Sequence, residues 1–174
     1  GKSTLVSLIA RLYDVTSGSI LYRGVDEKEL KPEFIRGKIG FVPQKASLFE
    51  GSLRDNMKWG KEDATDEEIY QALDIAQARE FVDQKEKGLD LRIEQNGGNL
   101  SGGQKQRLTI ARALVRKPEI LILDDSASAL DFATDARLRK AIKENTDNMT
   151  VFLVSQRVST IRNADHILVL DDGK

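Results

Sequence analysis

The apolar positions of this chain follow two different spacings along its length. Short apolar runs of strand length occupy residues 19–24, 38–44, 119–125 and 150–156. Between these runs lie segments in which apolar residues recur every three or four positions, which is the spacing of an amphipathic helix. Strands and helices are therefore expected to alternate, an order typical of an α/β fold with a largely parallel sheet.

Four segments have the helical spacing, and they are residues 3–18, 65–84, 101–118 and 132–146. In the first segment, the apolar residues expected on the buried face are Leu5, Leu8, Ile9 and Leu12, and the helix is expected to end near Gly18. Thr65 and Glu68 can form a capping box at the start of the second helix. Ser101 is expected to open the third helix and Pro118 to stop it.

The remaining segments complete the expected organisation. Residues 165–174 predict the start of a β-hairpin with a tight Asp-Gly turn. Residues 45–116 contain helices and loops but no clear strand. We therefore interpret 45–116 as a helical subdomain that is inserted into a core made of residues 1–44 and 117–174.

Composition narrows the class of protein. A chain of 174 residues with 40% hydrophobic residues can bury a sizeable core within one domain. The 27 basic and 28 acidic residues balance, so no nucleic acid or other polyanion is expected as a partner. The absence of cysteine fits a reducing compartment. No apolar run approaches the roughly 20 residues of a membrane span.

The first four residues, Gly1, Lys2, Ser3 and Thr4, match the end of the phosphate-binding pattern G-x-x-x-x-G-K-S/T. In that interpretation, Lys2 contacts phosphate and Ser3 is a ligand of Mg²⁺. A helix N-terminus beneath a glycine is a favourable place for a phosphate. So short a match is equally compatible with an ordinary helix start. The first glycine of the pattern would precede Gly1, so we expect the chain to begin inside this motif.

A buried apolar run ends in two adjacent carboxylates, Asp124 and Asp125. A carboxylate at the end of a buried strand can hold Mg²⁺, often through water. The alternative is that Asp124 is a turn acid or a helix cap.

At residues 100–107, LSGGQKQR, the chain resembles the ATP-binding cassette (ABC) family, whose signature is LSGGQ. The resemblance rests on GKST, FVPQ, LSGGQ, ILILDD and SALD in this order, and it covers nearly the whole chain. Residues 47–60 are similar to those of exporter cassettes, which are fused to transmembrane helices. The resemblance implies a P-loop NTPase (RecA-like) core with an inserted helical subdomain and missing N-terminal strands. It also implies bound ATP and Mg²⁺, at the cytoplasmic face of a cell membrane.

The signature residues are Ser101, Gly102, Gly103 and Gln104. The two glycines let backbone amides approach a phosphate, and the helix that follows points its positive end at the same anion. The alternative is a plain N-cap followed by flexible glycines. By resemblance, this motif closes over ATP that is held by a second ABC nucleotide-binding domain, in a hetero- or homodimer. A transmembrane domain is the other implied partner.

The resemblance assigns roles to three more residues. Gln44, in VPQ, is similar to the Q-loop glutamine that contacts Mg²⁺ and the attacking water. Asp124 matches the Walker B aspartate that holds Mg²⁺. Asp131, in SALD, matches the D-loop aspartate along the dimer contact, and it can also act as the N-cap of the helix that follows.

Two residues depart from the family pattern at its catalytic centre. Asp125 stands where hydrolytic cassettes have a glutamate that orients or deprotonates water. Its carboxylate is one methylene shorter, and a displacement of ~1 Å can cost roughly 10²-fold in rate. Gln156, in VSQR, stands where the family has a switch histidine, and a glutamine cannot carry a positive charge. We expect the sole histidine, His166, to be structural. Gln95 also replaces a glutamate that is usual in exporters.

The two departures together predict a degenerate site in a heterodimeric exporter. The chain's own site would bind ATP and hydrolyse it poorly, while its signature would complete the site of the partner. An open alternative is that a backbone shift or a water lets Asp125 act as the base. Two other functions also remain open: a nucleotide-binding regulatory module with negligible hydrolysis, and a soluble ABC ATPase outside transport. We further expect the isolated chain to be a weak or inactive ATPase that binds ATP poorly.

Overall fold

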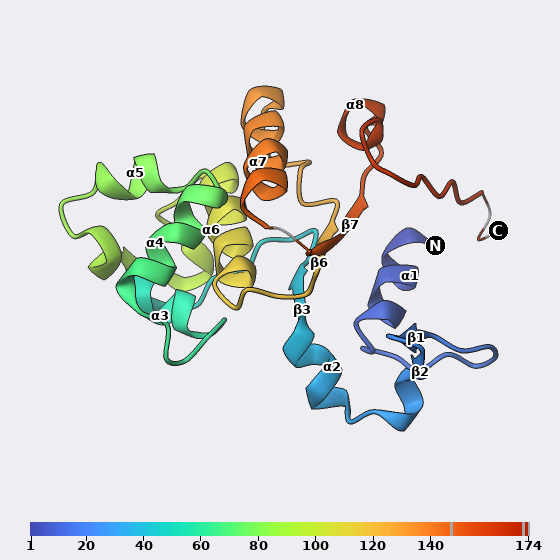
Figure 1. The fold of residues 1–174 in the computed structure, drawn as a ribbon. Helices are drawn as coiled ribbons and strands as arrows, with labels where there is room; N and C mark the ends of the chain where they lie inside the picture. The colour runs from blue at the N-terminus through green and yellow to red at the C-terminus, as the bar shows by residue number, and fades with distance from the viewer. Residues whose placement is uncertain (147, 172, 174) are drawn as a thin grey trace.

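A three-stranded parallel sheet lies at the centre of the fold (Figure 1). The computed structural model describes all residues except 147, 172 and 174. In the sheet, β6 (Ile120–Asp124) lies between β3 (Ile39–Val42) and β7 (Thr150–Val154). Val42 pairs with Leu123 and Asp124 pairs with Val154, so the carboxyl ends of the three strands meet at one edge.

Helices cover both faces of this sheet. Successive residues of a strand point to opposite faces. In β6, Ile122 packs with Val6 of α1 (Lys2–Ile9), whereas Leu121 and Leu123 join a larger core on the other face. That larger core includes Leu108 of α6 (Gly102–Leu114), together with residues of α7 (Phe132–Asn145). The strand is buried on both sides, which explains its unbroken apolar sequence.

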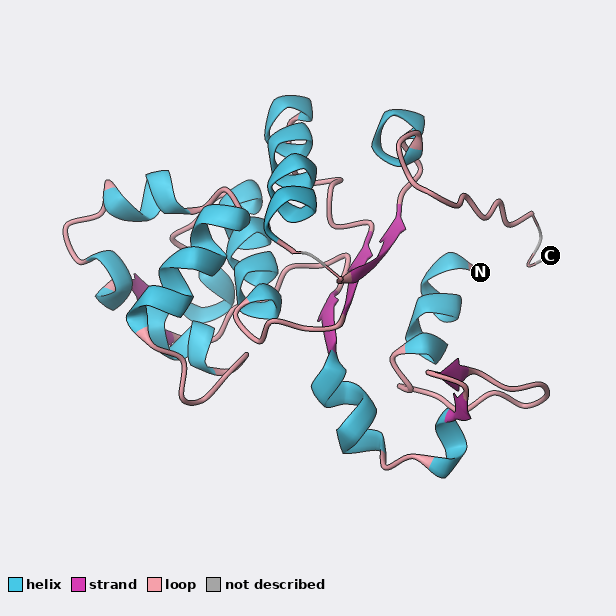
Figure 2. Cartoon of the chain, viewed as in Figure 1, coloured by secondary structure: helices cyan, strands magenta, loops and turns pink. Residues whose placement is uncertain are grey.

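The helical part of the chain groups together on the left of Figures 1 and 2. It comprises α3 (Leu53–Lys58), α4 (Asp66–Ile75), α5 (Arg79–Asp83) and α6, with 3₁₀ turns at Gly88–Asp90 and Gln95–Gly97. Two short strands, β4 (Gly51–Ser52) and β5 (Arg92–Ile93), pair antiparallel within it. The apolar core of this part is continuous with Leu121 and Leu123 of the sheet. The boundary of a separate subdomain at 45–116 therefore remains a prediction.

A small hairpin is fastened to the sheet through one glutamate. The hairpin consists of β1 (Leu21–Tyr22) and β2 (Val25–Asp26), and a 3₁₀ turn (Glu27–Glu29) and α2 (Pro32–Lys38) follow it. Glu119, which precedes β6, accepts a hydrogen bond from Tyr22 Oη at 2.5 Å and pairs with Lys38 Nζ at 2.7 Å. The hydrogen bonds from Lys38 and Tyr22 lower the pKa of Glu119 to about 2.

Most expected elements are present, with different ends. The strands expected at 38–44, 119–125 and 150–156 and the helices expected at 101–118 and 132–146 all form. The capping box of Thr65 and Glu68 is also present. The helix expected at 65–84 is interrupted, because Gln77 has a positive φ of 59° and separates α4 from α5. The sequence did not predict α2, α3, α8 (Val158–Ile161) or the pair of strands β4 and β5.

The expectation for the first helix was wrong in two respects. The helix α1 ends at Ile9 rather than near Gly18, and the left-handed residue Arg11 (φ 48°) follows it. Its buried side chain is that of Val6, and Ala10 directly after the helix is buried too, whereas Leu5 is 38% exposed. The sheet lies against the Val6 side of the helix, and the position of the sheet decides which face is buried.

The expected hairpin at the end of the chain does not form among the described residues. Residues 165–171 contain no strand, because no described strand lies beside them to supply hydrogen bonds. Asp172 of the expected turn lies outside the described residues. His166 is exposed and is not part of a strand. Among the described helices, none is both long and apolar enough to cross a membrane.

Candidate nucleotide-binding site

The first turn of α1 meets the end of β6. Ser3 Oγ donates a hydrogen bond to Asp124 Oδ1 at 3.0 Å, although the two residues are 121 positions apart. Asp124 is only 6% exposed, whereas Ser3 and its neighbours Gly1, Lys2 and Thr4 are exposed around the N-terminus of the helix. The structure thus brings two of the three predicted Mg²⁺ ligands, Ser3 and Asp124, from distant parts of the sequence into contact.

A second contact joins the end of β3 to the residue after β6. Gln44 Nε2 donates a hydrogen bond to Asp125 Oδ2 at 3.2 Å. Asp125 has a φ of 46°, a conformation that costs energy for a residue other than glycine. Its amide donates to the Val154 carbonyl at 3.0 Å, and its carbonyl accepts from Ser128 Oγ at 2.9 Å. The backbone contacts of the loop therefore fix the direction of the Asp125 carboxylate.

The same edge of the sheet also carries oxygen atoms that can act as ligands of Mg²⁺. This ion prefers oxygen ligands and usually keeps several waters while it binds one or two protein groups and substrate phosphates. The Ser3 hydroxyl and the Asp124 carboxylate form such a pair, and the Gln44 amide oxygen is on the neighbouring strand end. A buried carboxylate such as Asp124 needs a cation or hydrogen-bond donors. The residues present therefore fit the ion.

Asp131 caps the helix that follows the loop. Its Oδ1 accepts from the Thr134 amide at 2.9 Å, and its Oδ2 accepts from Thr134 Oγ1 at 2.7 Å. These hydrogen bonds lower the pKa of the Asp131 carboxyl. The capping role expected from the sequence is confirmed, while the contact of Asp131 with a partner remains a prediction.

The signature residues form the start of α6. The Gln104 amide donates to Ser101 Oγ at 3.2 Å, and the Ser101 amide donates to Gln104 Oε1 at 3.0 Å, which is a capping box. A Cβ on Gly102 would meet nothing within 4 Å, so this backbone is open to an approaching group. A Cβ on Gly103 would lie 3.3 Å from the Ala129 carbonyl, in the loop after β6. The capping role is present, and the exposed start of the helix stays available to an anion.

Ser101–Gln104 and the Ser3–Asp124 pair belong to different surfaces of the chain. The helix α6 packs in the large core, whereas α1 packs on the opposite face of the sheet (Figure 1). Ser101 and Gln104 bond to each other, and Ser3 bonds to Asp124. The structure therefore unites Ser3, Asp124, Gln44 and Asp125 at one edge and keeps the signature apart from them.

Gln156 follows β7 at the same sheet edge and is exposed. The next residue, Arg157, was not singled out from the sequence. Its guanidinium donates to the carbonyls of Ala127 at 3.2 Å, Leu130 at 3.3 Å and Ser128 at 3.3 Å. Its position directly after Gln156 in VSQR was the only available signal for it.

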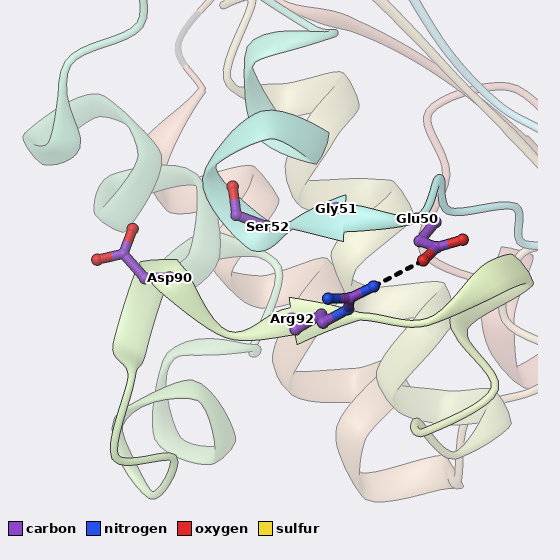
Figure 3. Close-up of a pocket in the computed structure, with 5 residues that line it drawn as sticks. All are labelled: Glu50, Gly51, Ser52, Asp90 and Arg92. Carbon is purple, nitrogen blue, oxygen red and sulfur yellow. Dashed lines mark hydrogen bonds and ion pairs between the residues drawn. The ribbon is translucent and has the colours of Figure 1, made fainter.

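A separate pocket lies between β4 and β5 (Figure 3). Glu50, Gly51, Ser52, Asp90 and Arg92 line it, and Arg92 Nη2 pairs with Glu50 Oε1 at 2.9 Å. None of these residues belongs to the predicted nucleotide site. The candidate nucleotide site at the edge of the sheet is therefore separate from this pocket.

Comparison with known proteins identifies the family of this chain. The sequence model of the family described as ABC transporter matches residues 1–128. An uncharacterized ABC transporter ATP-binding protein of Bacillus subtilis is 48% identical, over 100% of this chain and 30% of its own length. ABC transporter B family member 21 of Arabidopsis thaliana is 45% identical, over 100% of this chain and 13% of its own length.

A solved structure is similar to this chain in fold. The structure of a bacterial Atm1-family ABC exporter with ATP bound has a TM-score of 0.95 and 36% identity, and it covers 99% of this chain and 30% of that chain. The chain thus spans less than a third of the length of these proteins. Its mixed α/β fold with a parallel sheet is the P-loop NTPase fold of an ABC exporter nucleotide-binding domain. From its sequence, its fold and the meeting of Ser3 with Asp124, the chain belongs to the ABC transporter family.

Proposed function

We propose that this chain is the ATP-binding and hydrolysis module of an ABC exporter. The observation that carries the proposal is the 3.0 Å hydrogen bond between Ser3 Oγ and Asp124 Oδ1. It joins the end of the phosphate-binding loop to the acid at the end of the buried strand. This pairing is what a Mg²⁺-nucleotide site needs, because the ion must touch both the protein and the phosphates.

Each residue of the site has a distinct task in this proposal. Lys2 and the first amides of α1 bind phosphate oxygens, and Ser3, Asp124 and Gln44 hold the ion. When bound, Mg²⁺ neutralises the charge that develops on the phosphate oxygens. The protein's own contribution is position and fixed charge, which carry most of the catalysis in phosphoryl transfer.

We further propose that the chain's own site hydrolyses ATP poorly. Asp125 is short, its backbone is held in a strained conformation, and Gln44 occupies one of its oxygens at 3.2 Å. Gln156 offers no positive charge at the end of β7. The features of Asp125 and of Gln156 both support slow hydrolysis. They also favour the second candidate function, a regulatory nucleotide-binding module with negligible hydrolysis.

An exposed aromatic pair supports a transmembrane domain as the partner. Phe49 and Trp59 stack with ring centres 4.5 Å apart, and both are exposed. They lie in the stretch 47–60 that resembles exporter cassettes. Aromatic side chains are enriched in protein interfaces, so this pair suits docking of a membrane-embedded domain.

The first experiment tests nucleotide binding by the chain in its complete transporter. Equilibrium titration with Mg-ATP should show that Lys2→Ala and Asp124→Asn weaken binding to this site by about tenfold or more, because each removes a charge that faces the phosphates or the ion. Lys31→Ala, at an exposed lysine before α2, is the matched control and should bind like the wild type. Wild-type binding by Lys2→Ala would refute the proposal.

The second experiment tests the degenerate site. Asp125→Glu alone should restore little hydrolysis, because the residue that faces the γ-phosphate is also changed. Asp125→Glu combined with Gln156→His should restore more than the two single changes together, since groups that act as one catalytic unit are not additive. Turnover at this site should be measured with the partner's site inactivated. Full activity from Asp125→Glu alone would show that Gln156 is an adequate switch residue.

A further inference from the structure

A single guanidinium fastens the loop between β6 and α7 to the end of β7. Arg157 Nη1 donates to the carbonyls of Ala127 at 3.2 Å and Leu130 at 3.3 Å, and Nη2 donates to that of Ser128 at 3.3 Å. The same group lies 5.0 Å from the ring centre of Phe132, the first residue of α7. The planar fork of an arginine can reach several carbonyls at once, which the point charge of a lysine cannot.

A second set of bonds fastens the residues after Arg157 to α7. Thr160 Oγ1 donates to Asp135 Oδ2 at 3.3 Å, and Arg139 Nη1 donates to the Thr160 carbonyl at 3.4 Å. Thr160 and Asp135 are each 2% exposed. The chain that leaves β7 is therefore held at residue 157 by the loop and at residue 160 by the helix that follows this loop.

The loop held by Arg157 connects two parts of the proposed function. It begins at Asp125, beside the ion site, and ends at Asp131, the residue expected at the dimer contact. Gln156, at the γ-phosphate position, is the neighbour of Arg157 in the chain. The Ala129 carbonyl of the same loop also faces Gly103 of the signature.

We propose that Arg157 is a positioning residue that keeps the loop 125–131 and Gln156 in one fixed arrangement. A change at the nucleotide is then transmitted to the dimer-facing end of the loop. The inference rests on the proposed function of the chain as an exporter ATPase module. Arg157 acts through the loop carbonyls and does not itself contact nucleotide.

The test uses the complete transporter that carries this chain, with its partner. Arg157→Gln removes the guanidinium, Arg157→Lys keeps the charge without the fork, and Arg162→Gln changes an exposed arginine of the same segment as the control. Arg157→Gln should lower kcat for ATP by about tenfold or more, because it releases the dimer-facing end of the loop at the proposed competent site, where a displacement of ~1 Å is enough for that. KM and the Mg-ATP affinity of the chain's own site should change less than about twofold, because Lys2, Ser3 and Asp124 are untouched.

Two further readouts separate positioning from general stability. Hydrogen exchange should rise in the amides of 125–131 and 155–161, and stay unchanged elsewhere in the domain. Arg157→Lys should resemble Arg157→Gln rather than the wild type, which also provides a second variant if Arg157→Gln does not fold. Arg162→Gln should behave like the wild type in every measurement.

The possible results distinguish a failure of the positioning role from a failure of the proposed function. A wild-type kcat in Arg157→Gln or in Arg157→Lys, when the wild-type complex itself hydrolyses ATP, would overturn the positioning role alone. A parallel loss of kcat, nucleotide affinity and exchange protection throughout the domain would assign Arg157 to stability, and would also overturn it. If the wild-type complex neither binds nor hydrolyses ATP, both the proposed function and this inference are wrong.

Discussion

Glu27 is a buried acid whose surroundings disfavour the ionised form of its carboxyl group. Its side chain is 1% exposed, and among the described residues its Oε1 has no hydrogen-bond partner. Burial raises the pKa of the Glu27 carboxyl, and the nearby charge of Arg11 only partly opposes this effect. The guanidinium of Arg11 is engaged with the carbonyls of Glu27 and Leu30 instead. An ionised Glu27 therefore destabilises the folded state.

We predict that Glu27→Gln stabilises the protein at pH 7 by roughly 1 kcal/mol or more, because the amide removes the negative charge from a buried place. The folded pKa is raised, so the folded state binds more protons than the unfolded state above the ordinary pKa of 4.5. Wild-type stability consequently falls as the pH rises through this window, and the advantage of Glu27→Gln disappears below it. Urea unfolding at pH 7 and pH 4 measures the difference. Glu29→Gln, at an exposed acid in the same turn, is the control.

Some functional residues could be predicted from sequence motifs, and others could not. Ser3 and Asp124 each stand in a motif, and parallel strands bring their ends to one edge, so their meeting was predictable. Arg157 carries no such signal, because its partners are backbone carbonyls and any residue type can supply these. Glu27 is similar, since its burial depends on a 3₁₀ turn that the periodicity of the sequence does not reveal.

The helices α4 and α6 begin with the same kind of N-terminal cap. Thr65 and Glu68 form a capping box at α4, as Ser101 and Gln104 do at α6. Thr65→Ala and Ser101→Ala should each lower the free energy of unfolding by about 1 kcal/mol, because each removes one capping hydrogen bond. Only Ser101→Ala should reduce ATP turnover of the complete transporter. Equal losses of turnover in both variants would show that Ser101 acts only as a cap.

Helix boundaries depend on contacts that the periodicity of the sequence cannot report. Leu12 is 48% exposed although its spacing places it with Leu5, because the sheet packs on the side of Val6 and Ala10. Gln77 ends α4 with a positive φ, yet neither glycine nor proline marks that position. The long helix α6 and the strand β6 were predictable because their ends carry Ser101, Pro118 and two acids.

At the scale of the molecule, the sheet separates the two surfaces that the proposed function assigns to nucleotide. The α1 face carries Ser3 at its edge, and the opposite face carries α6 with the signature. In the proposed function, ATP bound at Ser3 and Asp124 would therefore meet the signature of another chain rather than that of its own. This arrangement supports two composite sites in a dimer, each with a different contribution from this chain.

The composite arrangement predicts unequal effects of two substitutions in the complete heterodimer. In the proposed arrangement with a degenerate own site, Asp125→Asn removes a carboxylate that is not the working base of the competent site, so steady-state ATP turnover should fall only slightly. Ser101→Arg places a bulky cation at the open start of α6, where the partner's γ-phosphate must dock. Turnover should then drop by about two orders of magnitude or more, because electrostatic and positional terms dominate phosphoryl transfer.

The matched control for Ser101→Arg is Thr65→Arg, which puts the same cation at the capping box of α4, away from the signature. It should cost stability without stopping turnover, since α4 contributes no residue to the proposed composite site. Turnover is measured on purified complexes with equal folding and nucleotide affinity. The expected asymmetry follows from the proposed roles, in which Asp125 acts on the nucleotide of its own chain and Ser101 acts across the dimer. If Asp125→Asn stops the complex as thoroughly as Ser101→Arg does, Asp125 is a true catalytic base and the degenerate site is wrong.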